Sequence, residues 1–581
     1  MIGSLLYAFG VVLVGFYLYK IGRYIFTTIQ QAVERWTAPE IKLAPPPAPA
    51  RSESASLSPL RPQIQDQPDM IQCFDKGTNA PLGTVRVVTK DNLEDIMRRA
   101  RTAQEKWAKT SFSTRRKLLF SLLNYVIKHQ KEICETSSIE CGKTMMDGAL
   151  GEILTTLEKL RWTCAQGEDV LAEEVRDVGL ITIHKRASVS YLPIGVVGAI
   201  VSWNYPFHNI YGPMISALFA GNAFVGKVSE YASYYAKYYQ DIVREGLVAL
   251  GQSPDLVHFI TGFAATGEAL VETADKITFI GSPAVGKKVM EKASKTLTPV
   301  VLELGGKDPA IILEDADLKQ VVPIMMRGTF QNCGQNCVGL ERIVAHTAIH
   351  DKLVEALKSK VEKLSQGAPS CSVKDLGAMT MGELSVNKIQ KLVDESVAAG
   401  AKLVVGGKAT SKNFFPATML INVTKDMPIA QEEVFGPVLV VFRFKTDDEA
   451  VDIVNGCPYG LGSNIFSANI PRAQAIAKRL KTGMVNINDF AINYLCQSLP
   501  FGGTKISGFD RFAGVEGLRG NCLVRSQTVD RIPGVKTEIP PVLQYPITEK
   551  SFQFMMLLVQ VLYGNVVQFV AAGLKLATFK A

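Results

Sequence analysis

Two cysteines, Cys333 and Cys337, lie four positions apart in the stretch FQNCGQNCVGLER, and His346 and His350 repeat this spacing shortly afterwards. Two thiols and two imidazoles could together bind zinc. However, only eight residues separate Cys337 from His346, whereas finger-type sites need roughly twelve or more and usually place both histidines on one helix. The segment ERIVAH, which ends at His346, is typical of a strand, and a helix is expected only near His350. The sequence therefore predicts no metal site.

One of the thiols could instead be a nucleophile. A thiolate adds readily to a carbonyl carbon when its pKa is lowered, when a carboxylate or imidazole is near, and when donors hold the oxyanion. The stretch VVLELGGKDP supplies Glu303, and IVSWNYPF supplies the amide of Asn204 on a loop after an apolar strand. Each signal alone is weak, because a glutamate before two glycines is usually structural and an asparagine before an aromatic–proline pair usually marks a turn.

Taken with other motifs in the same order, these stretches resemble the NAD(P)-dependent aldehyde dehydrogenases over residues 67–530. The motifs that carry the resemblance are WNYPF (203–207), GNAFVGKVSE (221–230), FIGSPAVG (279–286), LELGGKDP (302–309), GQNC (334–337) with Gly339 and Arg342, EEVFGPV (432–438), NIND (486–489) and PFGGTKISG (500–508). The resemblance implies oxidation of an aldehyde to a carboxylic acid through a cysteine thiohemiacetal and thioester.

The resemblance also implies a role for each matching residue. Cys337 is the expected nucleophile, Glu303 the base that activates water, and Asn204, with the backbone N–H of Cys337, the oxyanion donor. Cys333 is expected to be a packed neighbour, with a disulfide to Cys337 as the alternative. The residues expected to bind the cofactor are Ser202, Trp203, Lys227, Ser229, Glu230, Gly281, Ser282, Gly286, Glu433 and Phe435.

The expected cofactor is NAD rather than NADP. Lys227 and Glu230 match the positions that bind the adenosine ribose in the family, and a carboxylate there suits two hydroxyl groups and repels a 2′-phosphate. Two other functions stay open: a catalytically silent scaffold with the same fold, and an acylating semialdehyde dehydrogenase. Glu303 disfavours the latter, because such relatives often lack the water-activating glutamate.

The segments that must position these residues alternate between helix-like and strand-like patterns. Residues 92–109 are amphipathic, a helix is expected to begin at Ser113, and 196–201 and 223–226 are apolar throughout. Apolar strands that alternate with helices predict parallel sheets and an α/β fold. The resemblance divides this fold into a Rossmann-type NAD-binding domain (67–174 and 194–303), a catalytic domain (304–514) and a β-hairpin oligomerisation arm (175–193 and 515–530). A homodimer or homotetramer is therefore expected.

The N-terminus predicts a membrane anchor at residues 1–29. Residues 1–19 carry no charge and would span roughly 28 Å as a helix, close to the hydrocarbon thickness of a bilayer. Lys20 and Arg23 follow the apolar run instead of preceding it, which favours an uncleaved transmembrane helix with the rest of the chain in the cytosol. The endoplasmic reticulum is the expected membrane, and membrane-anchored plant and fungal aldehyde dehydrogenases are the expected relatives.

The flanking segments lie outside the resemblance. Residues 30–66 are rich in proline and serine and predict a stiff, solvated linker. In the tail (531–581), residues 552–574 are uncharged, and their glutamines would form one narrow polar stripe on a single helix. We expect this helix to associate with a membrane, with packing on the N-terminal helix and docking on the body as alternatives.

Composition limits the remaining possibilities. The excess of 63 Lys and Arg over 55 Asp and Glu is spread along the chain, which gives no basic block for nucleic acid. The ten cysteines are scattered, as in intracellular proteins with reduced thiols. An enzyme held at a membrane would meet aldehydes that partition into lipid, so medium or long-chain aliphatic aldehydes are the expected substrates.

Overall fold

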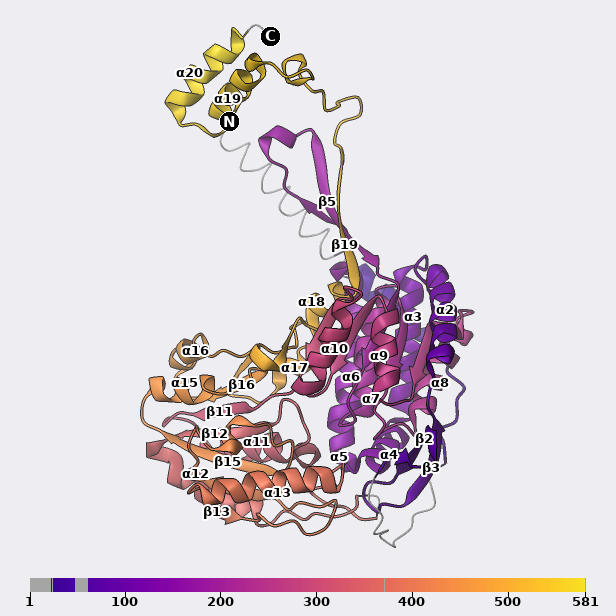
Figure 1. Cartoon of the computed structure of the whole chain (residues 1–581), viewed down its shortest axis with the longest axis vertical. Coiled ribbons are helices and arrows are strands. Elements are labelled where there is room, and N and C mark those ends of the chain that lie inside the picture. The colour runs from indigo at the N-terminus through magenta and orange to yellow at the C-terminus, as the bar shows by residue number, and fades with distance from the viewer. Residues whose placement is uncertain (1–21, 23–24, 48–60, 370, 580–581) are drawn as a thin grey trace. The chain divides into compact units, whose positions relative to one another are not determined.

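The computed structural model describes residues 22, 25–47, 61–369 and 371–579. The chain divides into two compact units. The body comprises the described residues of Met1–Ala172 and Tyr191–Val524, and the arm unit comprises Glu173–Ser190 and the described residues of Arg525–Ala581. Figure 1 labels the elements.

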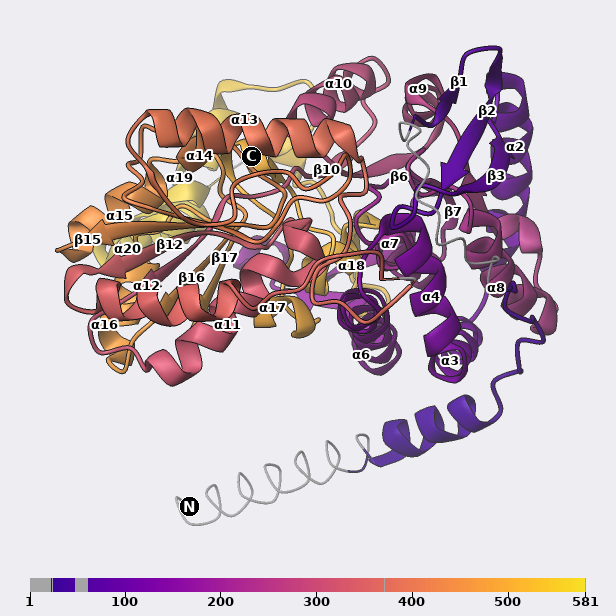
Figure 2. The ribbon, with the colours of Figure 1, turned by 90° about the horizontal axis from the view of Figure 1, so that it is seen from below.

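The first sheet of the body has five parallel strands and one antiparallel edge strand. Its order is β8-β7-β6-β9-β10-β18. The strands are β6 (Val196–Ile200), β7 (Ala223–Lys227), β8 (Val257–Ile260), β9 (Lys276–Ile280), β10 (Val300–Glu303) and β18 (Gly508–Phe509). Nearly every side chain of β6 to β9 is buried, because helices cover both faces (Figure 2). The central helices are α2 (Lys90–Trp107), α3 (Phe112–Lys128), α6 (Thr155–Val170), α7 (Pro206–Phe219), α8 (Ala236–Ala249), α9 (Ala264–Thr273) and α10 (Pro283–Ser294).

The second sheet of the body has six parallel strands and one antiparallel edge strand, β13. Its order is β13-β14-β15-β12-β11-β16-β17. The strands are β11 (Asp308–Ile312), β12 (Leu340–His346), β13 (Lys402–Val405), β14 (Thr418–Ile421), β15 (Val438–Phe444), β16 (Gly462–Phe466) and β17 (Met484–Ile487). Its helices are α11 (Leu318–Phe330), α12 (Thr347–Val361), α13 (Glu383–Ala398), α14 (Pro428–Gln431), α15 (Asp447–Asn455), α16 (Ile470–Ala477) and α17 (Ile492–Leu495). Each large sheet has its own apolar core.

Smaller elements complete the body. The strands β1 (Gln63–Ile64), β2 (Gln67–Phe74) and β3 (Pro81–Arg86) form an antiparallel sheet. Two short helices, α4 (Gln130–Cys141) and α5 (Met145–Gly148), precede a π-helical turn, η1 (Ala149–Leu154). The alternation of strands and helices confirms the predicted α/β fold. The predicted cap of α3 was wrong by two positions, because the side chain of Ser111 caps the helix by accepting from the Thr114 N–H.

The segment before residue 48 does not behave as the solvated linker predicted for residues 30–66. Glu34 and Arg116 are both buried and form an ion pair of 2.5 Å, and Arg116 also contacts Glu168 on α6. Ile41 lies in the core of the first sheet, and the backbone oxygen of Leu43 accepts a hydrogen bond from Tyr125. Residues 34–43 therefore pack on the body, because a buried ion pair and an apolar anchor offset the loss of chain freedom.

The predicted transmembrane helix concerns residues 1–29, most of which lie outside the described part of the chain. Among the described residues, no helix combines the length and the apolar character that crossing a bilayer requires. The anchor therefore stays a prediction.

The arm unit begins with an antiparallel hairpin. Its strands are β4 (Glu174–Arg176) and β5 (Lys185–Pro193), and β19 (Cys522–Asp530) lies on the other side of β5. The predicted arm differs at its second segment, 515–530, because α18 (Gly514–Arg519) packs against α6 and α7 within the body. The expected single helix over residues 552–574 was wrong: two helices, α19 (Glu549–Tyr563) and α20 (Val566–Ala577), pack against each other instead. Gly564 and Asn565 interrupt the helix, so the glutamines form no continuous stripe.

Candidate active site

Parallel strands of the first sheet bring the predicted site residues to one edge. The carboxyl end of β6 is followed by the loop of residues 202–204, β9 is followed by residues 281–282, and β10 ends at Glu303. β7 ends at Lys227. Because the carboxyl ends of parallel strands lie at the same edge, these segments meet without being close in sequence.

The loop between α11 and β12 delivers Cys337 from the second sheet. Asn332, Cys333 and Gly334 follow one another in the left-handed region, with φ of 53°, 55° and 71°. A Cβ atom on Gly334 would lie 2.1 Å from the backbone oxygen of Gly436. Only glycine therefore allows this loop to pack against the loop that leads into β15.

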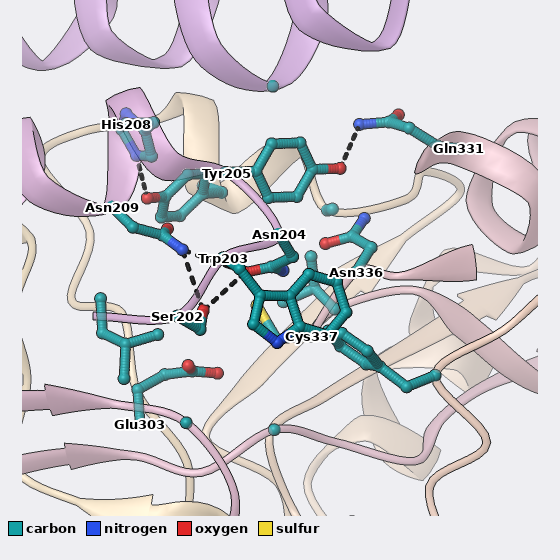
Figure 3. A pocket seen from close by; sticks show the side chains of 18 of the residues that line it. Ser202, Trp203, Asn204, Tyr205, His208, Asn209, Glu303, Gln331, Asn336 and Cys337 are labelled. Atoms are coloured by element: carbon teal, nitrogen blue, oxygen red, sulfur yellow. Dashed lines mark hydrogen bonds between the residues drawn. The ribbon is translucent and has the colours of Figure 1, made fainter. Parts of the chain in front are cut away.

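A cavity of about 570 Å³ joins the two sets of residues (Figure 3). Of the predicted site residues, its lining includes Cys337, Glu303, Asn204, Ser202, Trp203, Gly281, Ser282, Glu433 and Phe435. Lys227, Ser229, Glu230 and Gly286 do not line it. Cys333 is fully buried in the core of the second sheet, where its sulfur accepts a hydrogen bond of 3.4 Å from Gln366. The two cysteines thus have different surroundings, and both thiols are free.

Cys337 and Glu303 line the same cavity and share a desolvated environment. Burial raises the pKa of Glu303 to about 7, and the nearby Cys337 thiol lowers it in part. Burial, followed by the negative charge of Glu303, raises the pKa of Cys337 well above its usual range. One carboxylate oxygen of Glu303 has no hydrogen-bond partner among the described residues. The expectation of a lowered thiol pKa therefore differs from the structure, in which the thiol is neutral and a poised carboxylate lies beside it.

The side chain of Asn204 is held by its neighbours. Its Oδ1 accepts hydrogen bonds from the Ser202 hydroxyl (2.6 Å) and from Asn209 Nδ2 (3.0 Å). Its Nδ2 donates to the backbone oxygen of Gln335 at 3.1 Å, two residues before Cys337. Because hydrogen bonds fix both Oδ1 and Nδ2, the side-chain amide of Asn204 directs its N–H groups toward the nucleophile loop. Figure 3 shows Asn204 beside Cys337.

Behind Asn204 lies a buried ion pair that sequence reasoning missed. Lys143 Nζ donates to Glu152 Oε1 at 2.5 Å and to the backbone oxygen of Asn204 at 2.7 Å. Glu152 also accepts hydrogen bonds from the Ser137 hydroxyl and the His208 backbone N–H. Both charged side chains are completely buried. The pair is thus fully hydrogen-bonded, as a buried pair must be, and it fixes the main chain that carries the oxyanion donor.

A second missed network forms one wall of the cavity. The phenol of Tyr494 hydrogen-bonds His208 Nε2, and His208 Nδ1 lies 2.9 Å from the Thr156 hydroxyl. Burial lowers the pKa of His208 to about 3, so the imidazole is neutral at ordinary pH. A neutral imidazole has one donor and one acceptor. We assign the phenol as donor to Nε2 and Nδ1–H as donor to Thr156.

The other end of the cavity presents aromatic rings and a carboxylate. Trp203 meets Phe435 edge to face, with ring centroids 5.5 Å apart. Glu433 Oε1 accepts a hydrogen bond of 3.0 Å from the Gly306 N–H. Gly305 has a φ of 74°, which favours glycine, and a Cβ atom there would lie 2.3 Å from the same carboxylate.

One buried glutamate positions this wall. Glu341 accepts hydrogen bonds from the backbone N–H groups of Val434 (2.8 Å) and Phe435 (2.9 Å). Lys307, also buried, pairs with Glu341 at 2.5 Å. Phe435 has a φ of 53°, a strained value for an aromatic residue. Two hydrogen bonds to one carboxylate hold that strain in place.

The predicted adenosine-binding residues lie farther along the sheet edge. Lys227 Nζ is 3.6 Å from Glu230, and the Ser229 hydroxyl accepts from the Tyr231 N–H. Ser282 occupies the N-cap of α10 without a side-chain capping bond. Gly286 on this helix faces Leu304, which a Cβ atom would overlap at 2.4 Å. The free amino end of α10 suits an anionic group such as a pyrophosphate.

The histidines near Cys337 serve other purposes. His346 caps α12 by accepting from the Ala348 N–H, and His350 is buried and bonded to Asp351. Within the described part of the chain, no group of three or more His, Cys, Asp or Glu side chains could hold a metal ion.

Comparison with known proteins agrees with this geometry. The profile of the aldehyde dehydrogenase family matches residues 64–526. A putative aldehyde dehydrogenase-like protein of Schizosaccharomyces pombe is 41% identical over 504 residues, which cover 85% of this chain and 96% of the relative. A similar protein of Saccharomyces cerevisiae is 40% identical and covers 84% of this chain and 78% of the relative. The crystal structure of an NAD-dependent aldehyde dehydrogenase from Sinorhizobium meliloti superimposes with a TM-score of 0.75 at 30% identity, over 81% of this chain and 92% of that chain. The chain belongs to the aldehyde dehydrogenase family.

Proposed function

We propose that this protein oxidises apolar, medium- or long-chain aldehydes to carboxylic acids with NAD. The observation that carries the proposal is that the Cys337 thiol, the buried Glu303 carboxylate and the Asn204 amide line one cavity. A nucleophile, a base and an oxyanion donor are the groups that this oxidation needs.

The mechanism starts with Glu303, which accepts the thiol proton. The Cys337 thiolate then forms a C–S bond to the aldehyde carbon as the carbonyl π bond breaks. The alkoxide produced is stabilised by the amide of Asn204 and the backbone N–H of Cys337. The C–H bond breaks next, its electron pair leaves as hydride, and a thioester remains on Cys337.

Hydrolysis of the thioester uses Glu303 a second time. After its proton has passed to solvent, Glu303 takes a proton from the attacking water as the C–O bond forms. The C–S bond then breaks, the acid leaves, and the Cys337 sulfur takes up the proton from Glu303 to restore the thiol. A pKa near 7 suits this double role, because about half of the carboxyl groups are then ionised at neutral pH and the carboxylate is basic enough to accept a proton.

The residues present fit a nicotinamide dinucleotide. Residues 281 and 282 at the amino end of α10 would take its pyrophosphate, Lys227 and Glu230 its adenosine ribose, and Glu433 its second ribose. When bound, this group supplies the hydride acceptor. The carboxylate of Glu230, paired with Lys227 at 3.6 Å, supports NAD over NADP because it would repel a 2′-phosphate.

The lining of the cavity supports an apolar substrate. Its apolar lining residues include Leu150, Leu154, Tyr205, Phe490, Tyr494, Leu495, Phe501 and Phe512. Two cations also line it, but Arg327 pairs with Asp147 at 3.2 Å and Lys388 donates to the backbone oxygen of Glu433 at 2.6 Å. A succinate-semialdehyde dehydrogenase of Mycobacterium leprae is 31% identical over 78% of this chain and 99% of the relative. A substrate with a second carboxylate is disfavoured at Arg327, because Asp147 already compensates its charge; Lys388 keeps its charge beside a neutral backbone oxygen.

We further propose that residues 1–29 anchor the protein in a membrane, with the endoplasmic reticulum as the first candidate and the body in the cytosol. The uncharged run at residues 1–19, followed by Lys20 and Arg23, supports this proposal. We also propose that the protein forms a homodimer or homotetramer, in which the hairpin of β4 and β5 contacts another subunit.

The test compares two variants, each of which lacks one cysteine thiol. Cys337→Ala should abolish reduction of NAD by decanal, whereas Cys333→Ala, four positions away in the core, should retain it. The ratio of kcat/KM for decanal over acetaldehyde should exceed one. Absence of turnover across a broad panel of aldehydes would favour a silent scaffold. Turnover that needs a thiol acceptor such as coenzyme A would favour an acylating enzyme, and a preference for acetaldehyde would refute the substrate class.

A further inference from the structure

The C-terminal hairpin, α19 and α20 with the turn between them, is an apolar element with little cover. The two helices lie side by side (Figure 1), and Phe554 meets Phe579 edge to face. Most of their large apolar side chains nonetheless stay exposed, and Val567 is 76% exposed. The exposed residues are Phe552, Met555, Met556, Val559, Tyr563, Val566, Val567, Phe569, Val570 and Leu574.

Charge is absent from the hairpin except at one end. Residues 551–574 contain no Asp, Glu, Lys or Arg. Lys550 lies at the start of α19 and Lys575 near the end of α20, so antiparallel packing brings both lysines to the open end of the hairpin. There they border a groove whose floor includes Met556 and Leu557. The open end thus carries Lys550, Lys575 and one acidic residue, Glu549, which leaves a net positive charge, and the closed end carries no charge.

The backbone at the closed end is satisfied internally. Asn565 accepts a hydrogen bond from the Gln568 N–H, and the Gln568 side chain accepts from the Asn565 N–H, both at 3.0 Å. The Gly564 N–H donates to the Gln560 backbone oxygen at 3.0 Å. Capping bonds of this kind also occur at helix ends in water. Here they give these three N–H groups the partners that a hydrocarbon environment requires.

The length of the helices fits half a bilayer. Helices of 15 and 12 residues are about 22 and 18 Å long, whereas one leaflet contributes about 15 Å of hydrocarbon. Neither helix can span the membrane, but a hairpin can enter one leaflet and keep its charged end among the headgroups.

A second copy of the chain explains the exposed surface less well. On α20 the exposed apolar residues from Val566 to Leu574 cover about 160° of the circumference, whereas a stripe of about 100° is enough for packing on a protein core. A bilayer contacts every outward side at once. Lysines at the open end are also what anionic headgroups attract.

We propose that the C-terminal hairpin inserts its closed end into one leaflet of a membrane that contains anionic lipid, with Lys550 and Lys575 at the headgroups. This contact is independent of the catalytic reaction. It is also distinct from the proposed N-terminal anchor, because it involves a different segment and only one leaflet.

The test uses the full chain, reconstituted with vesicles of phosphatidylcholine and phosphatidylserine. A photoreactive phenylalanine analogue replaces Val567 in one preparation and Leu297, an 87% exposed apolar residue of the body, in the control. Illumination should give about tenfold more lipid adducts from position 567 than from position 297, because only the former lies in hydrocarbon. Adding Val570→Glu should abolish the adducts from position 567 while aldehyde oxidation is retained.

The lysines are tested by a matched pair of double variants. Lys550→Gln with Lys575→Gln should lower the yield of adducts by about fivefold for each lysine on vesicles with phosphatidylserine, and leave it unchanged on phosphatidylcholine alone. Lys391→Gln with Lys408→Gln, which changes two exposed lysines of the body, should have no effect. An equal loss on both kinds of vesicle would overturn the headgroup assignment.

Two results would overturn insertion itself. If position 567 gives chain-to-chain adducts but no lipid adducts, a second copy of the chain covers the hairpin. If lipid adducts from position 567 are no more abundant than those from position 297, the hairpin is exposed to water. Failure of the N-terminal anchor would give a different result. Fewer chains would then bind to the vesicles, but among the bound chains position 567 would still give more lipid adducts than position 297.

Discussion

Replacing Glu303 with glutamine should stabilise the protein, and more so at high pH. The carboxyl of Glu303 is buried beside a thiol, and its pKa is raised from 4.5 to about 7. Because the pKa of Glu303 is higher in the folded state than in the unfolded state, its contribution to stability is fully present below the unfolded-state pKa. That contribution is lost as the pH rises through the folded-state pKa. A shift of this size corresponds to about 3 kcal/mol lost at pH 8 and about 2 kcal/mol at pH 6.

The stabilisation by Glu303→Gln is tested more sharply by comparing it at the two pH values than by its size at either one. The amide of glutamine is itself costly to bury, by about 1–2 kcal/mol, but this cost does not depend on pH. The gain in the free energy of unfolding for Glu303→Gln should therefore be larger by about 1 kcal/mol at pH 8 than at pH 6.

Urea unfolding of the variant and the parent at both pH values measures this gain. Glu245→Gln on α8, which changes an exposed carboxylate, serves as the control and should show no such difference. The same gain at both pH values for Glu303→Gln would refute the reasoning, because the carboxyl would then titrate as an ordinary surface group.

Three further substitutions test the groups around the cavity. Glu341→Gln leaves Lys307 unpaired and frees the strained Phe435, so the KM for NAD should rise by about tenfold while the fold is retained, as initial-rate kinetics would show; an unchanged KM would contradict the positioning role. Tyr494→Phe leaves the buried Nε2 of His208 without its donor and should lower the free energy of unfolding by about 1–3 kcal/mol in urea, and a change below about 0.5 kcal/mol would argue against the assigned hydrogen bond. Gly334→Ala brings a Cβ atom within 2.1 Å of the Gly436 oxygen, so activity should fall at least about a hundredfold, whereas an active variant would show that the loop can shift.

Local sequence signals located the parts of the site that follow strands. The apolar runs at 196–201 and 223–226 correspond to β6 and β7, and the parallel arrangement then determines which loops meet. The raised pKa values of Glu303 and Cys337 could not be predicted in this way, because they depend on how much water the assembled cavity excludes.

Contacts between distant segments gave no sequence signal. Lys143 and Glu152 are nine positions apart, and Glu152 lies in a π-helical turn, so no regular helical spacing places them together. Glu34 and Arg116 are separated by 82 positions, and the surrounding prolines indicated a solvated linker. The break in the C-terminal hairpin did have a signal, since glycine followed by asparagine favours the end of one helix and the start of another, but the uncharged run suggested one helix.

The central claim is that Cys337 carries the acyl group and that Glu303 is its base. The most direct measurement is peptide mapping by mass spectrometry after the protein, NAD and decanal are mixed and quenched within a single turnover. We predict a decanoyl adduct on the peptide that contains Cys337, formed several times more slowly in Glu303→Gln. Acylation of another cysteine, such as the exposed Cys496, or reduction of NAD without any thioester, would contradict the account.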